Sequence, residues 1–173
     1  MQTLMIILRI LHILSGIFWV GTTLFLVLFL QPIISSSGAS GGAVMGRLAL
    51  SRFTLAISLS AVFTVVAGFI MYGIDSKGFQ TDWILAPQGI VLTIGALSGI
   101  GAAAVGVGVQ MPANIRLTKL QKEIQAGGGA PTPAQATEIK MLQARIGVAS
   151  RWGAILMVIA VLGMSTAREF GNI

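Results

Sequence analysis

A polar stripe runs along the first hydrophobic segment of the chain. Within the run RILHILSGIFWVGTTLFLVLFL, five residues that differ from the apolar background recur at intervals of three or four: Arg9, His12, Gly16, Trp19 and Thr23. On a helix this spacing puts them on one face. Polar and ionisable side chains inside a membrane span are costly unless another group meets them, so a partner is expected for this stripe.

Haem ligation is the chemistry that best suits the stripe. His12 is the only histidine in the chain, and an imidazole and a methionine thioether form a known pair of axial ligands for haem iron. The topology argued below puts His12 at the same depth as Met71 and Met164, so either methionine is a candidate partner. These residues predict a site for haem b, with His12 as the metal ligand.

The neighbours of His12 extend this hypothesis. Arg9 lies one turn nearer the outer surface, where its two-pronged guanidinium would pair with a haem propionate. Gly16 would leave room for the flat macrocycle, and Trp19 would pack on its edge. The competing interpretation is structural: His12 bonds a hydroxyl or carbonyl of a neighbouring helix, Arg9 reaches the lipid headgroups, and the methionines fill the core.

Other metal chemistry has less support in the sequence. Methionine and histidine are soft ligands that suit Cu(I). However, the eight methionines scatter along the chain and no Met-x-x-Met pair occurs. The chain has no cysteine, which removes disulfides, thiolate metal sites and iron–sulfur clusters.

The composition indicates a membrane protein. The chain of 173 residues is 55% hydrophobic and 9% charged, with a mean hydropathy of +0.90, whereas soluble domains carry about 25% charged residues. The formal charge of +6 comes from basic residues beside hydrophobic segments. Topology and anionic lipid explain that charge better than nucleic acid does, so the lipid bilayer is the expected partner and no nucleic acid is expected.

Four stretches reach the roughly 20 apolar residues that a membrane span needs. They cover residues 4–30, 53–73, 89–111 and 147–167. We therefore predict an all-α integral membrane fold, with a single four-transmembrane-helix bundle over residues 1–173. The serine- and glycine-rich residues 31–52 are expected to form a flexible polar turn.

The polar residues 112–146 are predicted to form a helical hairpin between the third and fourth spans. Apolar residues recur at helical spacing on both sides of the turn sequence AGGGAPTP. Thr132, followed by Pro133 and Gln135, resembles an N-cap with a proline at the first helical position and a capping-box partner.

The basic residues predict the orientation. Eight of the 11 Lys and Arg residues lie on the side of the first and third connections, and three lie on the other side. By the positive-inside rule, the hairpin is cytoplasmic and both termini are outside. We therefore expect a multi-pass protein of a bacterial inner membrane.

The third span has a face of small residues. Its members are Gly95, Gly99, Ala102, Ala103 and Gly106. Such a face is typical of close packing between helices. The alternative is a groove for a ring-shaped cofactor, a pigment or a lipid.

The carboxylates argue against an enzyme. All five lie in connections or near the C-terminus: Asp75, Asp82, Glu123, Glu138 and Glu169. No acid–base pair, catalytic triad or phosphate-binding loop occurs, so hydrolytic or transfer chemistry by this chain alone is not expected.

The first span also resembles a pattern in bacterial membrane proteins. It reads Leu11-His12-Ile13-Leu14, then Trp19-Val20-Gly21, then Pro32 just past the span, and Gln110-Met111-Pro112-Ala113-Asn114 is similar to the end of a later span in the same proteins. These are the copper-resistance protein D family, related integral membrane proteins and the HemJ-type protoporphyrinogen oxidases. The resemblance implies a haem ligand at His12. Since this chain has no second histidine and no lysine inside a span, the oxidase activity is not carried over.

Together these features predict a small integral membrane protein of a redox system. It either binds haem b at His12 or acts as an accessory subunit of a larger respiratory or photosynthetic complex, with other membrane subunits or further copies of itself as partners. The alternative from another class is a structural subunit without a cofactor. A copper or small-molecule permease is a third hypothesis, although ionisable residues at mid-membrane, which transport usually needs, are not evident.

Overall fold

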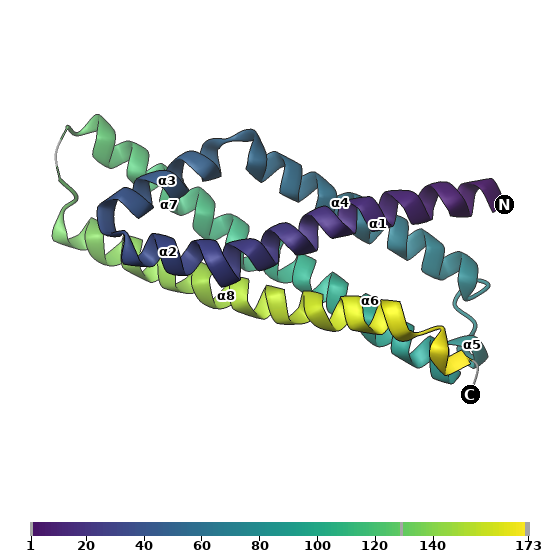
Figure 1. Cartoon of the computed structure of the whole chain (residues 1–173). Coiled ribbons are helices and arrows are strands. Elements are labelled where there is room, and N and C mark those ends of the chain that lie inside the picture. The colour runs from purple at the N-terminus through teal and green to yellow at the C-terminus, as the bar shows by residue number, and fades with distance from the viewer. Residues whose placement is uncertain (1, 129, 172–173) are drawn as a thin grey trace.

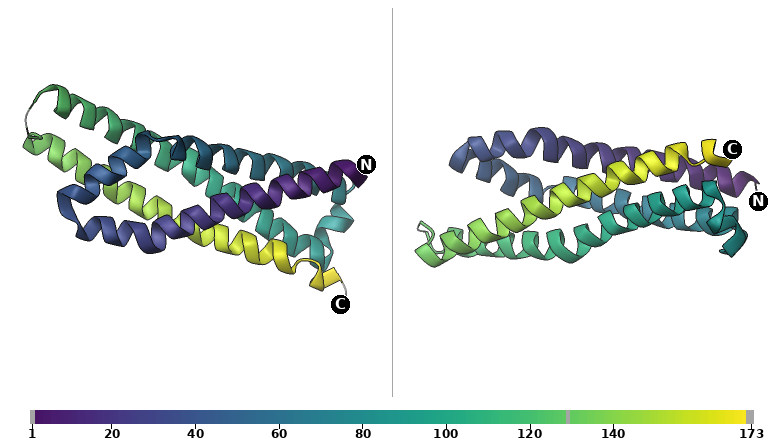
Figure 2. Two further views of the ribbon diagram at one scale, coloured as in Figure 1. Left: turned by 45° about the horizontal axis from the view of Figure 1, so that its top comes forward. Right: turned by 90° about the horizontal axis from the view of Figure 1, so that it is seen from below.

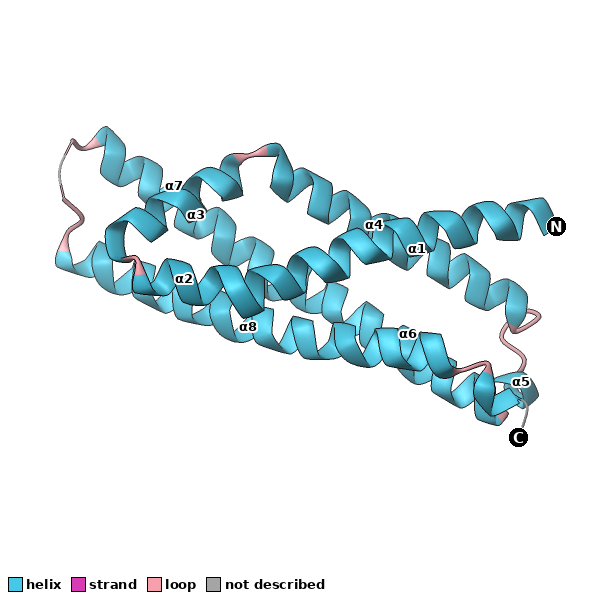
Figure 3. Ribbon diagram, viewed as in Figure 1, coloured by secondary structure: helices cyan, strands magenta, loops and turns pink. Residues whose placement is uncertain are grey.

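A computed structural model describes residues 2–128 and 130–171 of the chain (Figure 1). Over these residues the fold is all-helical, as Figure 3 shows. Four of the described helices are long and apolar enough to cross a membrane, and each contains all or nearly all of one of the four predicted apolar stretches. They cover Gln2–Ser36, Arg52–Asp75, Pro87–Ala126 and Pro133–Thr166.

The first half of the chain forms one helical pair. Helix α1 (Gln2–Phe25) continues through η1 (Leu26–Leu30), a turn of π-helix that we call a wide turn, into α2 (Gln31–Ser36). The chain then turns back through α3 (Gly38–Leu50), and α4 (Arg52–Asp75) packs along α1. We call α1 to α4 the first pair. The flexible turn predicted for residues 31–52 is therefore wrong, since only Ser37 and Ser51 interrupt the helices.

The serines after the first span are compatible with a helix because their hydroxyls bond back to the chain. Ser35 donates to the Pro32 carbonyl at 2.8 Å, and Ser37 donates to the Ile33 carbonyl at 2.7 Å. Such back-bonding satisfies the side chain without breaking the backbone ladder. A serine-rich sequence alone gave no way to distinguish this arrangement from a loop.

The second half of the chain repeats the arrangement. Helix α6 (Pro87–Val105) continues through the wide turn η2 (Gly106–Gln110) into α7 (Met111–Ala126), and α8 (Pro133–Thr166) returns along both. We call α6 to α8 the second pair. The capping box predicted at the start of α8 is confirmed: Gln135 N–H donates to the Thr132 hydroxyl at 3.3 Å, and Thr132 N–H donates to the Gln135 side chain at 2.9 Å.

Both wide turns precede a proline. In η1, the Gln31 N–H bonds the Leu26 carbonyl, five residues back, just before Pro32. In η2, the Met111 N–H bonds the Gly106 carbonyl in the same way, just before Pro112. Proline has no N–H and its ring clashes with the carbonyl four residues earlier, so a locally wider turn lets each long helix continue past it.

The two ends of the molecule differ. The first residues of α1, the short helix α5 (Thr81–Leu85) and the last turn η3 (Glu169–Gly171) gather at one end, which we call the terminal end (Figure 1). The α2–α3 and α7–α8 connections gather at the other, which we call the turn end. The views in Figure 2 show the helices of each pair side by side from two other directions.

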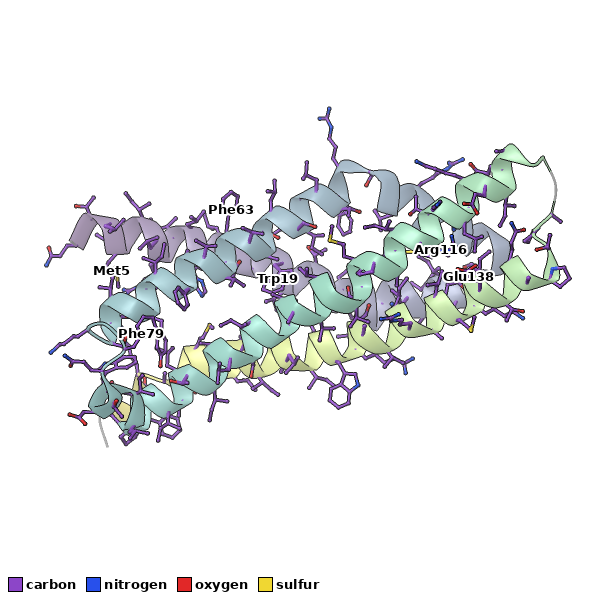
Figure 4. All side chains as sticks on the ribbon, turned by 180° about the vertical axis from the view of Figure 1, so that it is seen from behind. Met5, Trp19, Phe63, Phe79, Arg116 and Glu138 are labelled. Atoms are coloured by element: carbon purple, nitrogen blue, oxygen red, sulfur yellow. The ribbon has the colours of Figure 1, made fainter. Side chains whose placement is uncertain are left out.

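The long helices of both pairs meet at one small core. Its buried members are Trp19 of α1, Ala102 of α6 and Met157 of α8, and residues of α4 pack around them. Trp19 is 7% exposed and lies near the middle of the bundle (Figure 4). The two pairs pack extensively within themselves and only sparsely against each other, so this core is the main joint between them.

An ion pair ties α7 to α8 at the turn end. Arg116 binds Glu138 through two hydrogen bonds of 2.6 and 2.9 Å (Figure 4). The hydrogen bond from Arg116 is the main cause that lowers the pKa of the Glu138 carboxyl, so this carboxylate stays charged at neutral pH. One turn further along α7, Leu120 is 2% exposed.

Candidate functional site

The His12 ring lies between α1 and α4. Its Nδ1 atom is 2.8 Å from the backbone carbonyl oxygen of Thr64. A carbonyl oxygen can only accept, so Nδ1 must carry the hydrogen of this bond. In the neutral ring the other nitrogen, Nε2, then keeps its lone pair. Metal-binding histidines usually have this arrangement, in which one ring nitrogen donates to a carbonyl while the other binds the metal.

Gly68 makes the approach of the His12 ring possible. A Cβ atom at this position would lie 2.7 Å from the His12 Cε1 atom and 2.9 Å from Nδ1, which is closer than carbon atoms pack. Any larger residue would therefore push the ring away from α4. The sequence gives no sign of this role, because Gly68 is one of 22 glycines and belongs to no motif.

Hydroxyl groups continue the contact along the same seam. The Thr64 hydroxyl lies 2.9 Å from the Ser15 hydroxyl and 2.7 Å from the Ser60 carbonyl oxygen. Ser15 in turn donates to the Leu11 carbonyl at 2.6 Å. We call His12, Ser15, Ser60 and Thr64 the His12 network, and it joins α1 to α4 through polar groups in an otherwise apolar seam.

Two members of the predicted stripe, Gly16 and Trp19, lie against other side chains of the bundle rather than beside open space. A Cβ on Gly16 would lie 3.5 Å from the Thr64 Cγ2 atom, so the Thr64 side chain occupies the space that we expected for a macrocycle. Trp19 belongs to the buried core between the two pairs, and its ring is therefore committed to packing. The roles predicted for Gly16 and Trp19 beside a porphyrin remain predictions, and within this chain both residues lie against protein atoms.

The other predicted site residues are spread over the bundle. Arg9 is exposed on α1, one turn from His12 towards the terminal end. Met71 is half-buried and follows Gly68 by three residues on α4, so the two share a side of that helix. Met164 packs instead in the seam between α6 and α8, where its Cγ atom would lie 3.3 Å from a Cβ on Gly95.

The structure therefore separates the two candidate methionine ligands. Met71 belongs to a helix that contacts His12, whereas Met164 fills the small-residue face of α6 in the second pair. The close approach in that second seam extends to the backbones, because a Cβ on Gly163 would lie 3.0 Å from the Gly95 Cα atom. The packing role that the small-residue face predicted is confirmed at Gly95.

Two open grooves lie on the second pair. One, of about 490 Å³, is lined by residues of α6, η2 and α8, and the other, of about 260 Å³, lies nearer the terminal end. His12 lines neither of them. Among the described residues, no group of three or more His, Asp or Glu side chains is arranged to hold a metal ion.

An aromatic cluster at the terminal end escaped the sequence analysis. Tyr72 and Phe79 pack with ring centroids 5.9 Å apart, and Tyr72 meets Trp83 edge-on at 5.5 Å. The Tyr72 hydroxyl also hydrogen-bonds the Thr93 hydroxyl of α6. The cluster lies at the connection between the two pairs. The only sequence signal for it is the number of aromatic residues in this short segment.

No family model, no curated protein and no solved structure matches this chain. The resemblance of its first span to the copper-resistance protein D family therefore rests on the short motifs around His12 and Pro112 alone.

Proposed function

We propose that this chain is a multi-pass protein of a bacterial inner membrane, with both termini outside. The four long apolar helices support insertion. Eight of the 11 Lys and Arg residues lie towards the turn end, which favours the cytoplasm for the α2–α3 and α7–α8 connections. That the two connections share one end of the molecule agrees with this orientation (Figure 1).

We further propose that the chain is an accessory subunit of a membrane redox assembly and offers His12 as an axial ligand to haem b. The observation that carries this proposal is the bond from His12 Nδ1–H to the Thr64 carbonyl. It fixes the ring and the tautomer, and it leaves Nε2 with the lone pair that an iron ligand needs. When bound, haem would supply one-electron transfer.

The described residues around His12 are better suited to iron ligation by Nε2 than to enclosing a whole haem macrocycle. Thr64 fills the space beside Gly16, Trp19 is committed to the core, and neither groove is lined by His12. This favours a haem held at a contact with another chain, which would supply the remaining wall. Arg9 is exposed on the same helix and is available to a propionate there.

The apolar surface favours a partner of this kind. Large apolar side chains on α1 are half or more exposed, with Ile6 at 59%, Leu14 at 64% and Ile17 at 65%. In a bilayer this surface would meet either lipid or the helices of another subunit or a second copy. A sparse joint between the two pairs also leaves much of each helix available for such contacts.

A structural subunit without a cofactor is the second candidate. It is favoured by the hydrogen bonds of the His12 network, which join α1 to α4, and by the absence of buried side-chain N or O atoms without a partner among the described residues. On this account His12 serves to hold α1 against α4. The two candidates differ in whether His12 affects only stability or also an absorption spectrum.

The subunit proposal is tested by gentle extraction of the tagged chain from its native membrane. We expect larger redox proteins to co-purify in a fixed ratio, and we expect haem staining in that fraction. A chain that migrates alone, as a monomer or as a homodimer with no haem-containing protein, would contradict the proposal.

A further inference from the structure

The larger groove lies where the second pair widens around η2. Its walls come from Val105 and Val109 on one side, and from Val148, Ala149 and Trp152 of α8 on the other, with Arg145 lining it as well. The groove opens along the side of the bundle rather than into its core. It is a shallow, open groove of about 490 Å³.

The sequence explains why a hollow forms at this place. Two of its lining residues, Ala144 and Ala149, contribute only a methyl group each. Gly106 and Gly108, next to Val105 and Val109 in the chain, add no side chains. Trp152, 59% exposed, then stands as a large apolar wall at one end.

The groove combines one charge with an otherwise apolar lining. Arg145 is the only ionisable residue that lines it. Among the described residues, the one ion pair is that between Arg116 and Glu138. The Arg145 guanidinium therefore has no carboxylate partner among them. A cation without a counter-ion beside an apolar groove favours a ligand with an anionic head and a hydrocarbon tail.

The charged and apolar parts of the lining are spaced as the two parts of a lipid are. Arg145 and Trp152 are seven residues apart on α8, which is about 10 Å along a helix. The headgroup layer of a bilayer is several ångströms thick on each side of the hydrocarbon core. With Arg145 at the headgroups, Trp152 therefore reaches the first part of the acyl chains.

We propose that this groove binds an anionic phospholipid, whose phosphate pairs with Arg145 and whose acyl chain lies along Val105, Val109 and Trp152. The inference rests on the proposed insertion in a membrane. The smaller groove makes a useful contrast, because Val91, Ile94 and Ile159 line it together with other residues, none of which is charged.

The test measures quenching of Trp152 fluorescence by lipids with brominated acyl chains. The full-length protein is reconstituted in phosphatidylcholine vesicles that contain a fixed fraction of brominated phosphatidylglycerol or, separately, brominated phosphatidylcholine. The signal of Trp152 is obtained as the difference between wild type and Trp152→Phe, because the chain has two other tryptophans. Flotation with the vesicles reports insertion independently of the groove.

We expect the anionic lipid to compete about fivefold better for the site, the factor that one basic residue gives near a membrane surface. Arg145→Gln should abolish this preference. Arg151→Gln is the matched control, since Arg151 is exposed on the same helix but does not line the groove, and it should keep the preference. Val148→Phe, which fills the groove from its exposed rim without adding a second tryptophan there, should reduce quenching by both lipids.

Three results would overturn the proposal in a protein that floats with the vesicles. Equal quenching by the two lipids would mean that the groove has no preference for an anionic headgroup. Equal losses in Arg145→Gln and Arg151→Gln would assign the preference to general surface charge. Absence of Trp152 quenching by either lipid would mean that a helix of another chain or copy covers the groove. A protein that does not float would instead contradict the proposed membrane insertion.

Discussion

The chemistry of His12 depends on what a second helix offers it. The Thr64 carbonyl accepts from Nδ1 and thereby settles which nitrogen keeps its lone pair. Gly68 provides the space for the ring. Gly68 belongs to no sequence motif, yet it affects the position of the His12 ring as much as any polar neighbour does.

Gly68→Ala should weaken the contact between α1 and α4. The new methyl group would lie 2.7 Å from His12 Cε1, so the ring has to move away and lengthen its bond to Thr64. Overpacking of this kind costs about 1–3 kcal/mol. We expect a lower midpoint of thermal unfolding in detergent, followed by circular dichroism.

Gly21→Ala is the control for that experiment. It lies on α1, and a Cβ there meets nothing within 4 Å. Since alanine is a better helix former than glycine, its thermal midpoint should equal or exceed that of the wild type. If Gly68→Ala is as stable as Gly21→Ala, the close packing described at His12 is incorrect.

The sequence indicated the kind of partner that His12 meets but not which residue supplies it: the structural alternative, a bond to a hydroxyl or carbonyl of a neighbouring helix, matches the bond to the Thr64 carbonyl. The spacing of the stripe correctly put His12 and Gly16 on one side of α1, because helical periodicity is local. Which partners that side meets depends on how α4 packs against it, and nothing in the local pattern specifies this. For that reason Thr64, Gly68 and the burial of Trp19 could not be predicted.

Among the helices, local signals succeeded where a side chain caps the backbone. The capping box at Thr132 was readable because its two hydrogen bonds join residues three apart. The segment 31–52 failed because its serines bond back into a helix, and glycine and serine composition alone favours a turn. The wide turns before Pro32 and Pro112 were also missed, since proline in a helix is usually read as an end.

Thr132→Ala should destabilise the start of α8. The substitution removes the hydroxyl that accepts from Gln135 N–H, and the loss of such a cap typically costs about 1 kcal/mol. Hydrogen exchange should be faster in the first turn of α8 than in the wild type. Thr137→Ala, whose hydroxyl only bonds back to the Pro133 carbonyl, should leave that turn unchanged; similar exchange in both variants would argue against the cap.

Across the chain as a whole, a helix, a wide turn, a proline and a returning helix occur twice. No internal repeat is visible in the amino-acid sequence, and the similarity appears only in the positions of η1 and η2 within the two long helices. Each pair is well packed internally, and the pairs meet mainly around Trp19. Along these helices the bundle also leaves many large apolar side chains exposed.

The proposed orientation can be tested with single cysteines, because the natural chain has none. Lys77→Cys lies in the connection before α5, and Gln125→Cys lies at the exposed end of α7. In intact cells, a membrane-impermeant maleimide should label position 77 and should label position 125 only after the membrane is permeabilised. The opposite pattern would reverse the orientation, and labelling of both positions in intact cells would contradict a membrane barrier between the two ends.

The absorption spectrum of the chain isolated with its native partners addresses His12 most directly. We predict a Soret band in the wild type and in Thr64→Val, which keeps the carbonyl that His12 bonds. We predict its loss in His12→Ala at equal yield of the same assembly. A colourless wild-type assembly, or a band that survives in His12→Ala unchanged, would contradict haem ligation and leave the structural subunit as the better account.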